Sequence, residues 1–286
     1  MPKIDLSKIE TIIRDVAAVE IMPRFRKLAA SDVEMKGVND PVTVADKESE
    51  RRLTEQLTSY LPGSVVVGEE SFARDKAIMA HVDAEHPVWV IDPIDGTRNF
   101  VAGVPEFAVM VALVDKRRTI ASWIHDPNSG DTVMAEQGGG VWLRGKRLKL
   151  AAADPAIPTV GLVGSRVKKL ISDPSLMPQG GDLPKIEIGS CAGFDYPRLF
   201  TGEVSFANSP LPRAGFLFYR HTNAWDHVPG LFLHHAAGGY SADWLGKPYD
   251  MTNARSGLLF ASDEATWRRL HKLFEPLMQH TIQKAL

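Results

Sequence analysis

The chain has 286 residues, of which 44% are hydrophobic, so it can bury a sizeable core as one large domain or two closely packed halves. Its formal net charge of −2 gives no general attraction to nucleic acid or membrane surfaces. Cys191 is the single cysteine, which excludes an internal disulfide and favours a reducing compartment. Because the N-terminus also lacks the apolar core of a signal peptide, we expect a soluble, cytoplasmic protein.

The first 150 residues combine helix signals with a series of strands. Ser7-x-x-Glu10 has the pattern of a capping box, and apolar residues at helical spacing follow it toward Pro23. A second helix is expected to follow Thr43-Val-Ala-Asp46 and to stop at Pro62-Gly63. Short apolar runs between turn residues then predict strands, and the last four of them read as an antiparallel meander: 65–67, 88–91, 107–114, 119–125, 131–135 and 141–143.

The pattern changes near residue 151, where alanines and prolines indicate a junction between two halves, 1–150 and 151–286. In the second half, predicted strands alternate with predicted helices, which is typical of an α/β layer arrangement. The strands are expected at 159–163, 185–188, 216–219 and 257–261, and the helices at 166–172, 190–201, 226–237 and 263–284. The chain therefore joins an α+β half to an α/β half.

The segment Trp89–Phe100, with the sequence WVIDPIDGTRNF, is the most informative stretch of the chain. Asp92 ends an apolar strand, and Asp95-Gly96-Thr97 follows on a tight turn. Carboxylates at this density suit a hard cation such as Mg²⁺ or Mn²⁺, and a backbone that turns at a glycine can present N–H groups to an anion. An isolated D-x-x-D-G is more often a solvated turn with a helix cap than a metal site, so other parts of the sequence must decide between the two interpretations.

Three further acidic elements lie at the ends of predicted helices or strands. Glu69 and Glu70 directly follow a valine strand, Asp46 lies at the start of the second helix, and Asp226 opens a helix. Asp226 alone is explained equally well as a plain N-cap. Sites in layered α/β proteins usually form where such ends meet, so the four elements together predict one acidic site.

At this point the motifs resemble those of the inositol monophosphatase family, which are lithium-sensitive, magnesium-dependent phosphomonoesterases. The matching segments, in family order, are Asn39–Asp46, Gly68–Ser71, Trp89–Phe100, Gly189–Ala192, and Trp225-Asp226 with Gly238-Gly239. They cover nearly the whole chain. The resemblance implies the layered α-β-α-β-α sandwich that this family shares with fructose-1,6-bisphosphatase.

The resemblance also implies two Mg²⁺ ions per site, with room for a third and with Mn²⁺ as a substitute. Asp92 would bridge the two ions, and the full set of implied metal ligands is Glu69, Asp92, the Ile94 carbonyl, Asp95 and Asp226. Thr97 and Asp46 would orient and deprotonate a metal-bound water, so the implied catalytic residues are Asp46, Thr97 and Glu69. Glu70 either holds the third ion through water or supports the other ligands.

The resemblance implies that the substrate is a small phosphorylated metabolite. The residues that it implies for substrate contact are Lys36, Gly96, Thr97, Ser190, Cys191, Ala192, Tyr219 and Asp226. Family members specific for inositol phosphate carry a glutamate at the place of Tyr219, and a tyrosine cannot offer paired carboxylate acceptors. Inositol phosphate, histidinol phosphate and fructose 1,6-bisphosphate therefore all stay open as substrates.

Two other readings of the acidic motif remain. Asp-Gly-Thr also occurs in haloacid-dehalogenase-type phosphatases, but these need D-x-D spacing, whereas Asp92 and Asp95 are three apart. A non-catalytic regulatory binding protein would keep the fold without the reaction, and the complete set of implied metal ligands argues against it. The resemblance further implies a homodimer, inhibition by Li⁺ and Ca²⁺, and no requirement for nucleic acid or membrane.

Overall fold

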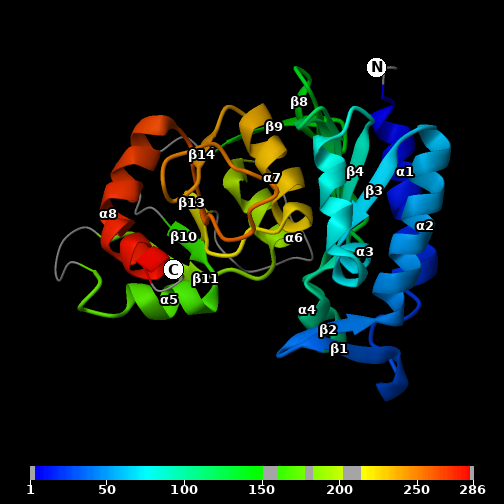
Figure 1. Cartoon of the computed structure of the whole chain (residues 1–286), viewed down its shortest axis with the longest axis horizontal. Coiled ribbons are helices and arrows are strands. Elements are labelled where there is room, and N and C mark those ends of the chain that lie inside the picture. The colour runs from blue at the N-terminus through cyan, green and yellow to red at the C-terminus, as the bar shows by residue number, and fades with distance from the viewer. Residues whose placement is uncertain (1–3, 151–159, 178–182, 202–213, 284–286) are drawn as a thin grey trace.

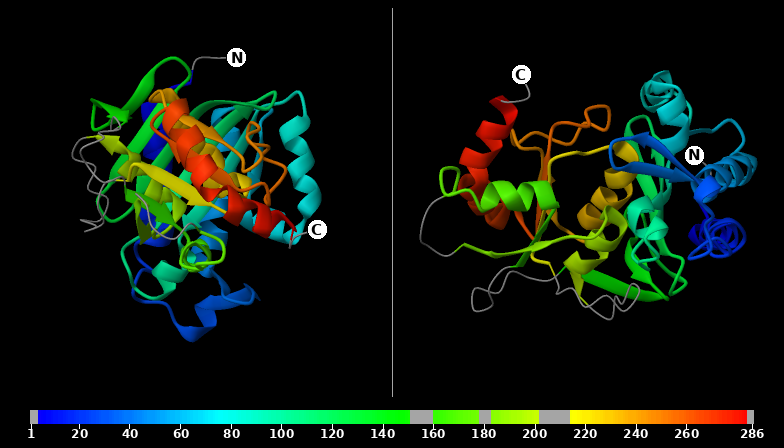
Figure 2. Two further views of the ribbon diagram at one scale, coloured as in Figure 1. Left: turned by 90° about the vertical axis from the view of Figure 1, so that its left-hand side faces the viewer. Right: turned by 90° about the horizontal axis from the view of Figure 1, so that it is seen from below.

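The protein consists of five layers in which helices and sheets alternate (Figure 1). Two N-terminal helices cover one face of a large sheet, two central helices separate it from a smaller sheet, and two further helices cover the outer face of the smaller sheet (Figures 1 and 2). This computed structural model describes residues 4–150, 160–177, 183–201 and 214–283. The predicted layered sandwich is confirmed. The predicted junction near residue 151 lies outside the described residues, and the division into two halves stays a prediction.

The first layer contains helices α1 (Leu6–Val16) and α2 (Val44–Tyr60). Asp5 caps α1, because its side chain accepts a hydrogen bond from the Lys8 amide; the cap predicted from the Ser7 pattern was therefore two residues too late. A π-helical turn, Ala17–Ile21, extends α1. The two helices bury their apolar stripes against the large sheet, with Ile9, Ile13, Leu53 and Leu57 fully buried.

Helix α2 begins as predicted, and its first turn fixes a residue of the predicted site. Thr43 is the N-cap, and its hydroxyl accepts from the Ala45 amide. Asp46 completes the capping box by accepting from the Thr43 amide at 2.8 Å. The Asp46 side chain is fully buried, so the cap holds a carboxylate inside the protein.

The large sheet has eight strands in the order β12-β9-β8-β7-β6-β5-β4-β3. The predicted strands are present, and β9 and β12 were missed by the sequence analysis. Strands β3 and β4 are parallel, and the other pairs are antiparallel. The bounds are β3 Val65–Gly68, β4 Val88–Asp95, β5 Ala108–Asp115, β6 Arg118–Asp126, β7 Asp131–Glu136, β8 Gly140–Leu143, β9 Lys146–Leu150 and β12 Phe200–Thr201.

Strand β4 carries the acidic turn, and it does not stop at Pro93. It continues to Asp95, but its pairing with β5 shifts between Asp92 and Asp95. Such an irregularity re-aims side chains at the end of a strand. Because β3 pairs with β4 in parallel, with Gly68 opposite Ile91, Glu69 and Asp92 emerge at the same edge.

The smaller sheet has five strands in the order β11-β10-β13-β15-β14. Strands β10, β11 and β13 are parallel, while β14 and β15 run antiparallel to their neighbours. The three parallel strands therefore end at one common edge. The bounds are β10 Val160–Val163, β11 Lys185–Ile188, β13 Phe216–Tyr219, β14 Tyr240–Ala242 and β15 Leu258–Ala261, of which β14 was not predicted.

Helix α7 (Ala224–Ala236) lies between the two sheets and contacts both, which places Asp226 at the centre of the molecule. The helix predicted over 190–201 is much shorter: α6 spans Ala192–Asp195, a 3₁₀ turn follows, and the chain then joins the large sheet as β12.

Helices α5 (Ser165–Ile171) and α8 (Glu264–Gln283) form the outer layer. Near the site lie the hairpin β1 (Val33–Gly37) and β2 (Asp40–Thr43), α3 (Glu69–Arg74) and α4 (Thr97–Val101).

Within the described ranges, no helix combines the length and the apolar character that crossing a bilayer requires.

Two glycines of the β10 region offer a matched test of packing in the smaller sheet. A Cβ on Gly161 would lie 2.0 Å from the ring of buried Phe216, whereas one on Gly164 would meet nothing within 4 Å. We expect Gly161→Ala to lower the free energy of unfolding by about 1–3 kcal/mol, because a buried ring must shift. Gly164→Ala should change it much less. Urea unfolding of both variants measures the difference, and equal effects would contradict the packing described here.

Candidate active site

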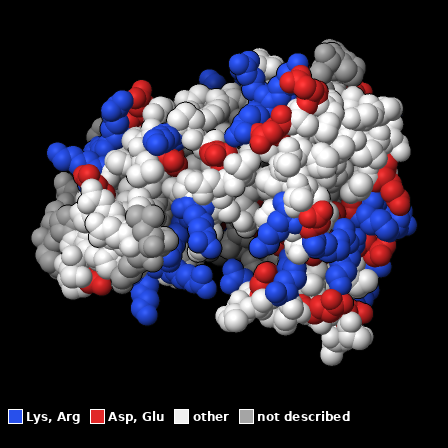
Figure 3. Space-filling model, in the orientation of Figure 1, with Lys and Arg blue, Asp and Glu red and all other residues white. Residues whose placement is uncertain are grey.

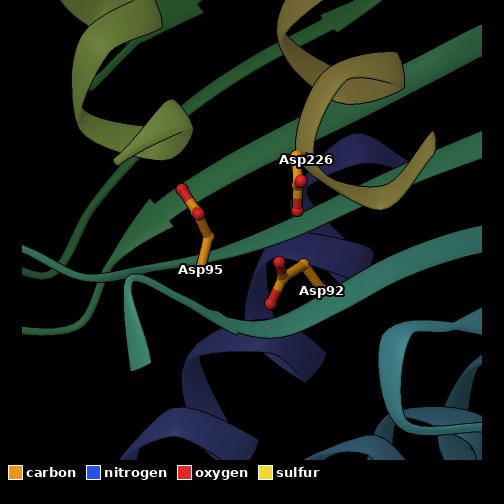
Figure 4. A group of neighbouring side chains, drawn as sticks. All are labelled: Asp92, Asp95 and Asp226. Atoms are coloured by element: carbon orange, nitrogen blue, oxygen red, sulfur yellow. The ribbon is translucent and has the colours of Figure 1, made fainter. Parts of the chain in front are cut away.

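Three aspartates from two distant segments meet between the sheets (Figure 4). Asp92 and Asp95 come from β4 and Asp226 from the first turn of α7, and one carboxylate oxygen of each lies within 4.8 Å of the others. Asp92 is 1% exposed and Asp95 9% exposed. The Asp95 carboxylate also accepts from the Gly193 amide at 2.5 Å, which ties it to α6. The three carboxylates predicted to share metal ions are therefore adjacent.

Asp46 and Thr97 form a second polar group beside these aspartates. The Thr97 hydroxyl lies 3.0 Å from Asp46 Oδ1 and 3.0 Å from the Ile94 carbonyl oxygen. Asp46 Oδ2 accepts from the Thr43 amide and hydroxyl, so this carboxylate is held at both oxygens. The structure thus brings together the predicted pair Asp46 and Thr97, 51 residues apart.

Glu69 and Glu70 face Lys36 of the β1–β2 hairpin. The Lys36 ammonium lies 2.6 Å from Glu69 Oε1 and 2.8 Å from Glu70 Oε1. Lys36 therefore lies next to the site, as predicted, but it is ion-paired with both glutamates. A residue the sequence analysis missed, Glu50 of α2, caps α3 by accepting from the Glu70 and Ser71 amides at 2.7 Å each. No short motif contains Glu50, so only the fold reveals it.

Gly96 makes the turn between the aspartates and α4, and only glycine fits it. Its φ is +93°, in the left-handed region that favours glycine. A Cβ at this position would lie 2.9 Å from the Glu106 carbonyl oxygen and 3.1 Å from Cys191 Sγ. The glycine therefore lets the turn approach the loop that carries Cys191.

The loop Gly189–Ala192 connects β11 to α6 and lies against this turn. The Asn99 side-chain amide donates to Ser190 Oγ at 3.0 Å and to the Glu106 carbonyl at 2.7 Å. Cys191 Sγ donates weakly to the same carbonyl at 3.6 Å, and Ala192 is buried as the first residue of α6. Asn99 belongs to the WVIDPIDGTRNF segment, but one of its two partners, Ser190, lies 91 positions away in the chain.

The buried Asp195 and the half-buried Tyr219 form a hydrogen-bonded pair behind the loop. Asp195 accepts from the Ser190 amide at 2.9 Å and from the Tyr219 hydroxyl at 3.1 Å. The Tyr219 hydroxyl, predicted to contact the substrate, thus already donates to a carboxylate. Asp195 was missed because the sequence analysis placed it inside a longer helix, where an acidic residue carries no functional signal.

Burial raises the pKa of five carboxyl groups of the candidate site: Asp46, Glu69, Asp92, Asp95 and Asp226. Burial raises the pKa of Asp95 to about 6 and that of Asp46 to about 6. Burial, with repulsion from Asp95, raises the pKa of Asp226 to about 7. Burial, only partly offset by Lys36 and reinforced by Asp226, raises that of Glu69 to about 8. The pKa of Asp92 is raised well above its ordinary value by burial and by the neighbouring carboxylates.

The donor set fits a hard divalent cation. It consists of oxygen atoms alone, the carboxylates converge from separate elements, and their mutual repulsion falls when a positive charge lies between them. Asp92, Asp95 and Asp226 would hold such an ion. The two other predicted ligands have protein partners in this structure: Glu69 accepts from Lys36, and the Ile94 carbonyl accepts from the Thr97 hydroxyl.

Comparison with known proteins gives matches along nearly the whole chain. A family model described as the inositol monophosphatase family matches residues 5–281. The inositol-1-monophosphatase of Rhizobium meliloti is 31% identical over 227 residues, which are 77% of this chain and 78% of that protein. A Thermotoga maritima protein named fructose-1,6-bisphosphatase/inositol-1-monophosphatase is 29% identical over 217 residues (76% and 77%). The Nus factor SuhB of Escherichia coli is also 29% identical over 217 residues (76% and 77%).

Solved structures show the same fold. An IMPase from Thermotoga maritima superposes with a TM-score of 0.75 at 23% identity, covering 98% of both chains. Inositol monophosphatase II from Staphylococcus aureus gives a TM-score of 0.70 at 17% identity, covering 98% of this chain and 94% of that one.

The raised pKa values predict that the metal-free protein loses stability as the pH rises. Unfolded Glu69 and Asp226 lose their protons near pH 4, whereas the folded protein holds them up to pKa values of about 8 and about 7. Their contribution to the free energy of unfolding is therefore fully present below their pKa values in the unfolded chain. It is lost as the pH rises through their pKa values in the folded protein. We expect the urea midpoint of chelator-treated protein to fall between about pH 7.5 and about pH 8.5, where Glu69 loses its proton in the folded protein.

Addition of Mg²⁺ should reverse most of this fall, because the cation replaces the protons between the carboxylates. Asp226→Asn should show a flatter pH profile and a smaller response to Mg²⁺. A wild-type profile that is flat over this range, or a variant that responds to Mg²⁺ as strongly as the wild type, would contradict the electrostatic account. Histidines with depressed pKa values, such as His227 at about 4, release protons from the unfolded chain around pH 6.5, so they oppose the fall only below about pH 7.5.

Proposed function

Since the chain belongs to the inositol monophosphatase family and is a phosphomonoesterase, we propose that it hydrolyses a small sugar, polyol or amino-alcohol phosphate with the help of Mg²⁺. The observation that carries the proposal is the convergence of Asp92, Asp95 and Asp226, of which the first two are buried and the third is half-buried, with one oxygen of each within 4.8 Å of the others. Two Mg²⁺ ions, or Mn²⁺ in their place, would be held by these residues together with Glu69 and the Ile94 carbonyl. When bound, the cations supply Lewis-acid stabilisation of phosphoryl charge and make water more acidic.

Thr97 and Asp46 are proposed to take the proton of the attacking water. The single proton of the Thr97 hydroxyl has two acceptors at 3.0 Å, Asp46 Oδ1 and the Ile94 carbonyl oxygen. When it is donated to Asp46, the lone pairs of the Thr97 oxygen can accept a hydrogen bond from a water. Asp46, with a pKa of about 6 because of its burial, is mostly ionised at neutral pH and is basic enough to receive a proton. The Thr43 cap keeps the carboxylate oriented toward Thr97.

Substrate placement is proposed to depend on the two segments that flank the aspartates. The Gly96 and Thr97 amides would hold phosphoryl oxygens, while Ser190, Cys191 and Ala192 would border the leaving group. Lys36 would contribute positive charge near Glu69 rather than bind the phosphate alone, because its ammonium is already paired. Tyr219 would shape the pocket through its bond to Asp195.

The family match over residues 5–281 leaves no support for the haloacid-dehalogenase alternative. Inositol phosphate is the substrate suggested by the names of the relatives, and the SuhB relatives, named Nus factors, leave a regulatory role open alongside catalysis. The homodimer, the third cation at Glu70, the inhibition by Li⁺ and Ca²⁺, and the cytoplasmic location stay predictions.

Removal of one central carboxylate tests the metal assignment. We expect Asp92→Asn to lower kcat by about 100-fold or more and to weaken the response to Mg²⁺, because an amide cannot neutralise a cation. Phosphate release from inositol 1-phosphate, titrated with Mg²⁺ after chelation, is the measurement. Asp15→Asn, on the exposed face of α1, is the matched control and should behave as wild type. Full activity of Asp92→Asn, or of chelated wild type, would refute the assignment.

The proposed role of Thr97 predicts a split between kcat and KM. Thr97→Val keeps the size of the side chain but removes the hydroxyl, and we expect kcat to fall by about 10²–10⁴-fold with a much smaller change in KM. Thr97→Ser, which keeps a hydroxyl, should recover most of the rate. If valine and serine variants lost activity equally, the hydroxyl would have no part in the proton transfer.

A further inference from the structure

Glu50 of helix α2 is a buried carboxylate that takes no part in the proposed metal set or in the proposed proton transfer. On the face of the molecule shown in Figure 3, Asp and Glu side chains lie at the surface among Lys and Arg side chains. Glu50 differs, because it is only 3% exposed, and its basic neighbour, the exposed Arg74 guanidinium, lies 3.8 Å from Glu50 Oε1. A buried charge with so distant a counter-charge is costly, so its hydrogen bonds must account for its position.

The hydrogen bonds of Glu50 go to the start of helix α3, which carries Glu69 and Glu70. Glu50 Oε2 accepts from the Glu70 amide and Oε1 accepts from the Ser71 amide, each at 2.7 Å. The first amides of a helix have no partner within the helix, and the N-cap of α3 is Gly68, which has no side chain to supply one. Glu50 therefore caps this helix from a different element, with both oxygens of one carboxylate.

Gly68 makes this close approach possible. A Cβ on Gly68 would lie 2.4 Å from Glu50 Oε2 and 2.6 Å from the carboxyl carbon of Glu50. The φ of Gly68 is −110°, which any residue adopts, so the backbone conformation does not require a glycine. The space that the Glu50 carboxylate occupies does require one.

Helix α2 connects this contact to the proposed base. Asp46 and Glu50 are four residues apart on α2, which places them on one face of the helix, and both are buried. Asp46 Oδ1 lies 3.0 Å from the Thr97 hydroxyl, while Glu50 holds the start of α3. One helix thus positions the part of the site around Thr97 and the part around Glu69 together.

Glu69 lies beside the aspartates, although among the described residues it is not one of the three carboxylates within 4.8 Å of one another. After burial, the charge of Glu69 is the largest cause that raises the pKa of Asp92, so the two groups are close. The Glu69 carboxylate accepts from Lys36 Nζ at 2.6 Å. To bind a cation next to Asp92 it must release this ammonium, and its backbone is then held by the helix that Glu50 caps.

We propose that Glu50 is a positioning residue for metal binding: it fixes the start of α3, so that Glu69 keeps its place beside Asp92 when its carboxylate releases Lys36 and binds a divalent cation. This inference rests on the proposed function, since it assigns Glu69 to a metal ion. Groups that orient metal ligands without touching the ion commonly change metal affinity by about 10–100-fold when they are replaced. Such a loss should appear in metal binding, and much less in the rate at saturating Mg²⁺.

Glu50→Gln tests the proposal in the full chain. Glutamine has nearly the same shape, but its NH₂ group cannot accept from an amide, so one of the two bonds to α3 is lost. We expect the dissociation constant for Mn²⁺, measured by electron paramagnetic resonance of the unbound ion, to rise by about 10-fold or more. The Mg²⁺ concentration for half-maximal phosphate release from inositol 1-phosphate should rise similarly, while kcat at saturating Mg²⁺ should change by less than about 3-fold.

Two further variants separate positioning from stability. Gly68→Ala displaces the Glu50 carboxylate without changing a charge and should weaken Mn²⁺ binding in the same way, which keeps the proposal testable if Glu50→Gln does not fold. Glu55→Gln, the same substitution on the exposed side of α2, is the matched control and should bind Mn²⁺ as the wild type does. If Glu50→Gln or Gly68→Ala lowered the thermal unfolding temperature but kept the wild-type Mn²⁺ affinity, Glu50 would only support the fold, and the proposal would be overturned.

A double-mutant cycle shows whether Glu50 acts through Glu69. Because Glu69→Gln removes the ligand itself, adding Glu50→Gln to it should weaken Mn²⁺ binding by less than about 2-fold further. A loss as large as in the wild-type background would mean that Glu50 acts on other groups, such as Asp46 on the same helix. That result would also overturn the proposal.

Failure of the proposed function gives a different result. A wild-type protein that neither binds Mn²⁺ nor releases phosphate would overturn the metal assignment, and the role of Glu50 would fall with it. Wild-type binding and activity that Glu50→Gln leaves unchanged would overturn the Glu50 proposal alone.

Discussion

The repulsion among buried carboxylates is the constraint on which the rest of the structure depends. Asp92 and Asp95 are buried and Asp226 is half-buried beside them, and neighbouring negative charges in such a place repel more strongly than at an open surface. An arrangement of this kind persists only if the surrounding structure holds it in place. The capped start of α2, the Gly193 amide on Asp95 and the Asn99 bridge to Ser190 are parts of that support.

The layered fold explains how residues separated by more than 130 positions come to share a site. The first two aspartates lie where the pairing of β4 with β5 shifts, and the third lies on the first turn of α7 between the sheets. Contacts from α7 to both sheets fix the position of Asp226 relative to β4. The active site is thus formed by packing between layers, and substitutions far from it can change its geometry by moving α7.

The sequence allowed most elements and the grouping of Asp92, Asp95 and Asp226 to be predicted, because local signals identified them. Apolar runs bounded by turns marked the strands, and Thr43-x-x-Asp46 marked the start of α2. The misses have local causes as well. Asp5 caps α1 although Ser7 offered the stronger pattern, and the chain after Asp195 leaves its helix early because Phe200 and Thr201 pair with β9. Pairing between strands that are far apart in the chain leaves no periodic pattern of apolar residues in the sequence, so it could not be predicted.

The contacts that decide substrate choice were the hardest to foresee, since they join residues that no motif groups together. Tyr219 attracted attention as a replacement for a glutamate, yet its hydroxyl donates to Asp195, a carboxylate supplied by another segment. The acidic function lost at position 219 is therefore restored behind the loop, where it positions the Ser190 amide. The Tyr219 hydroxyl is therefore committed to the carboxylate that holds the Ser190 loop, and the residue type at position 219 alone would misjudge what this part of the pocket offers to a substrate.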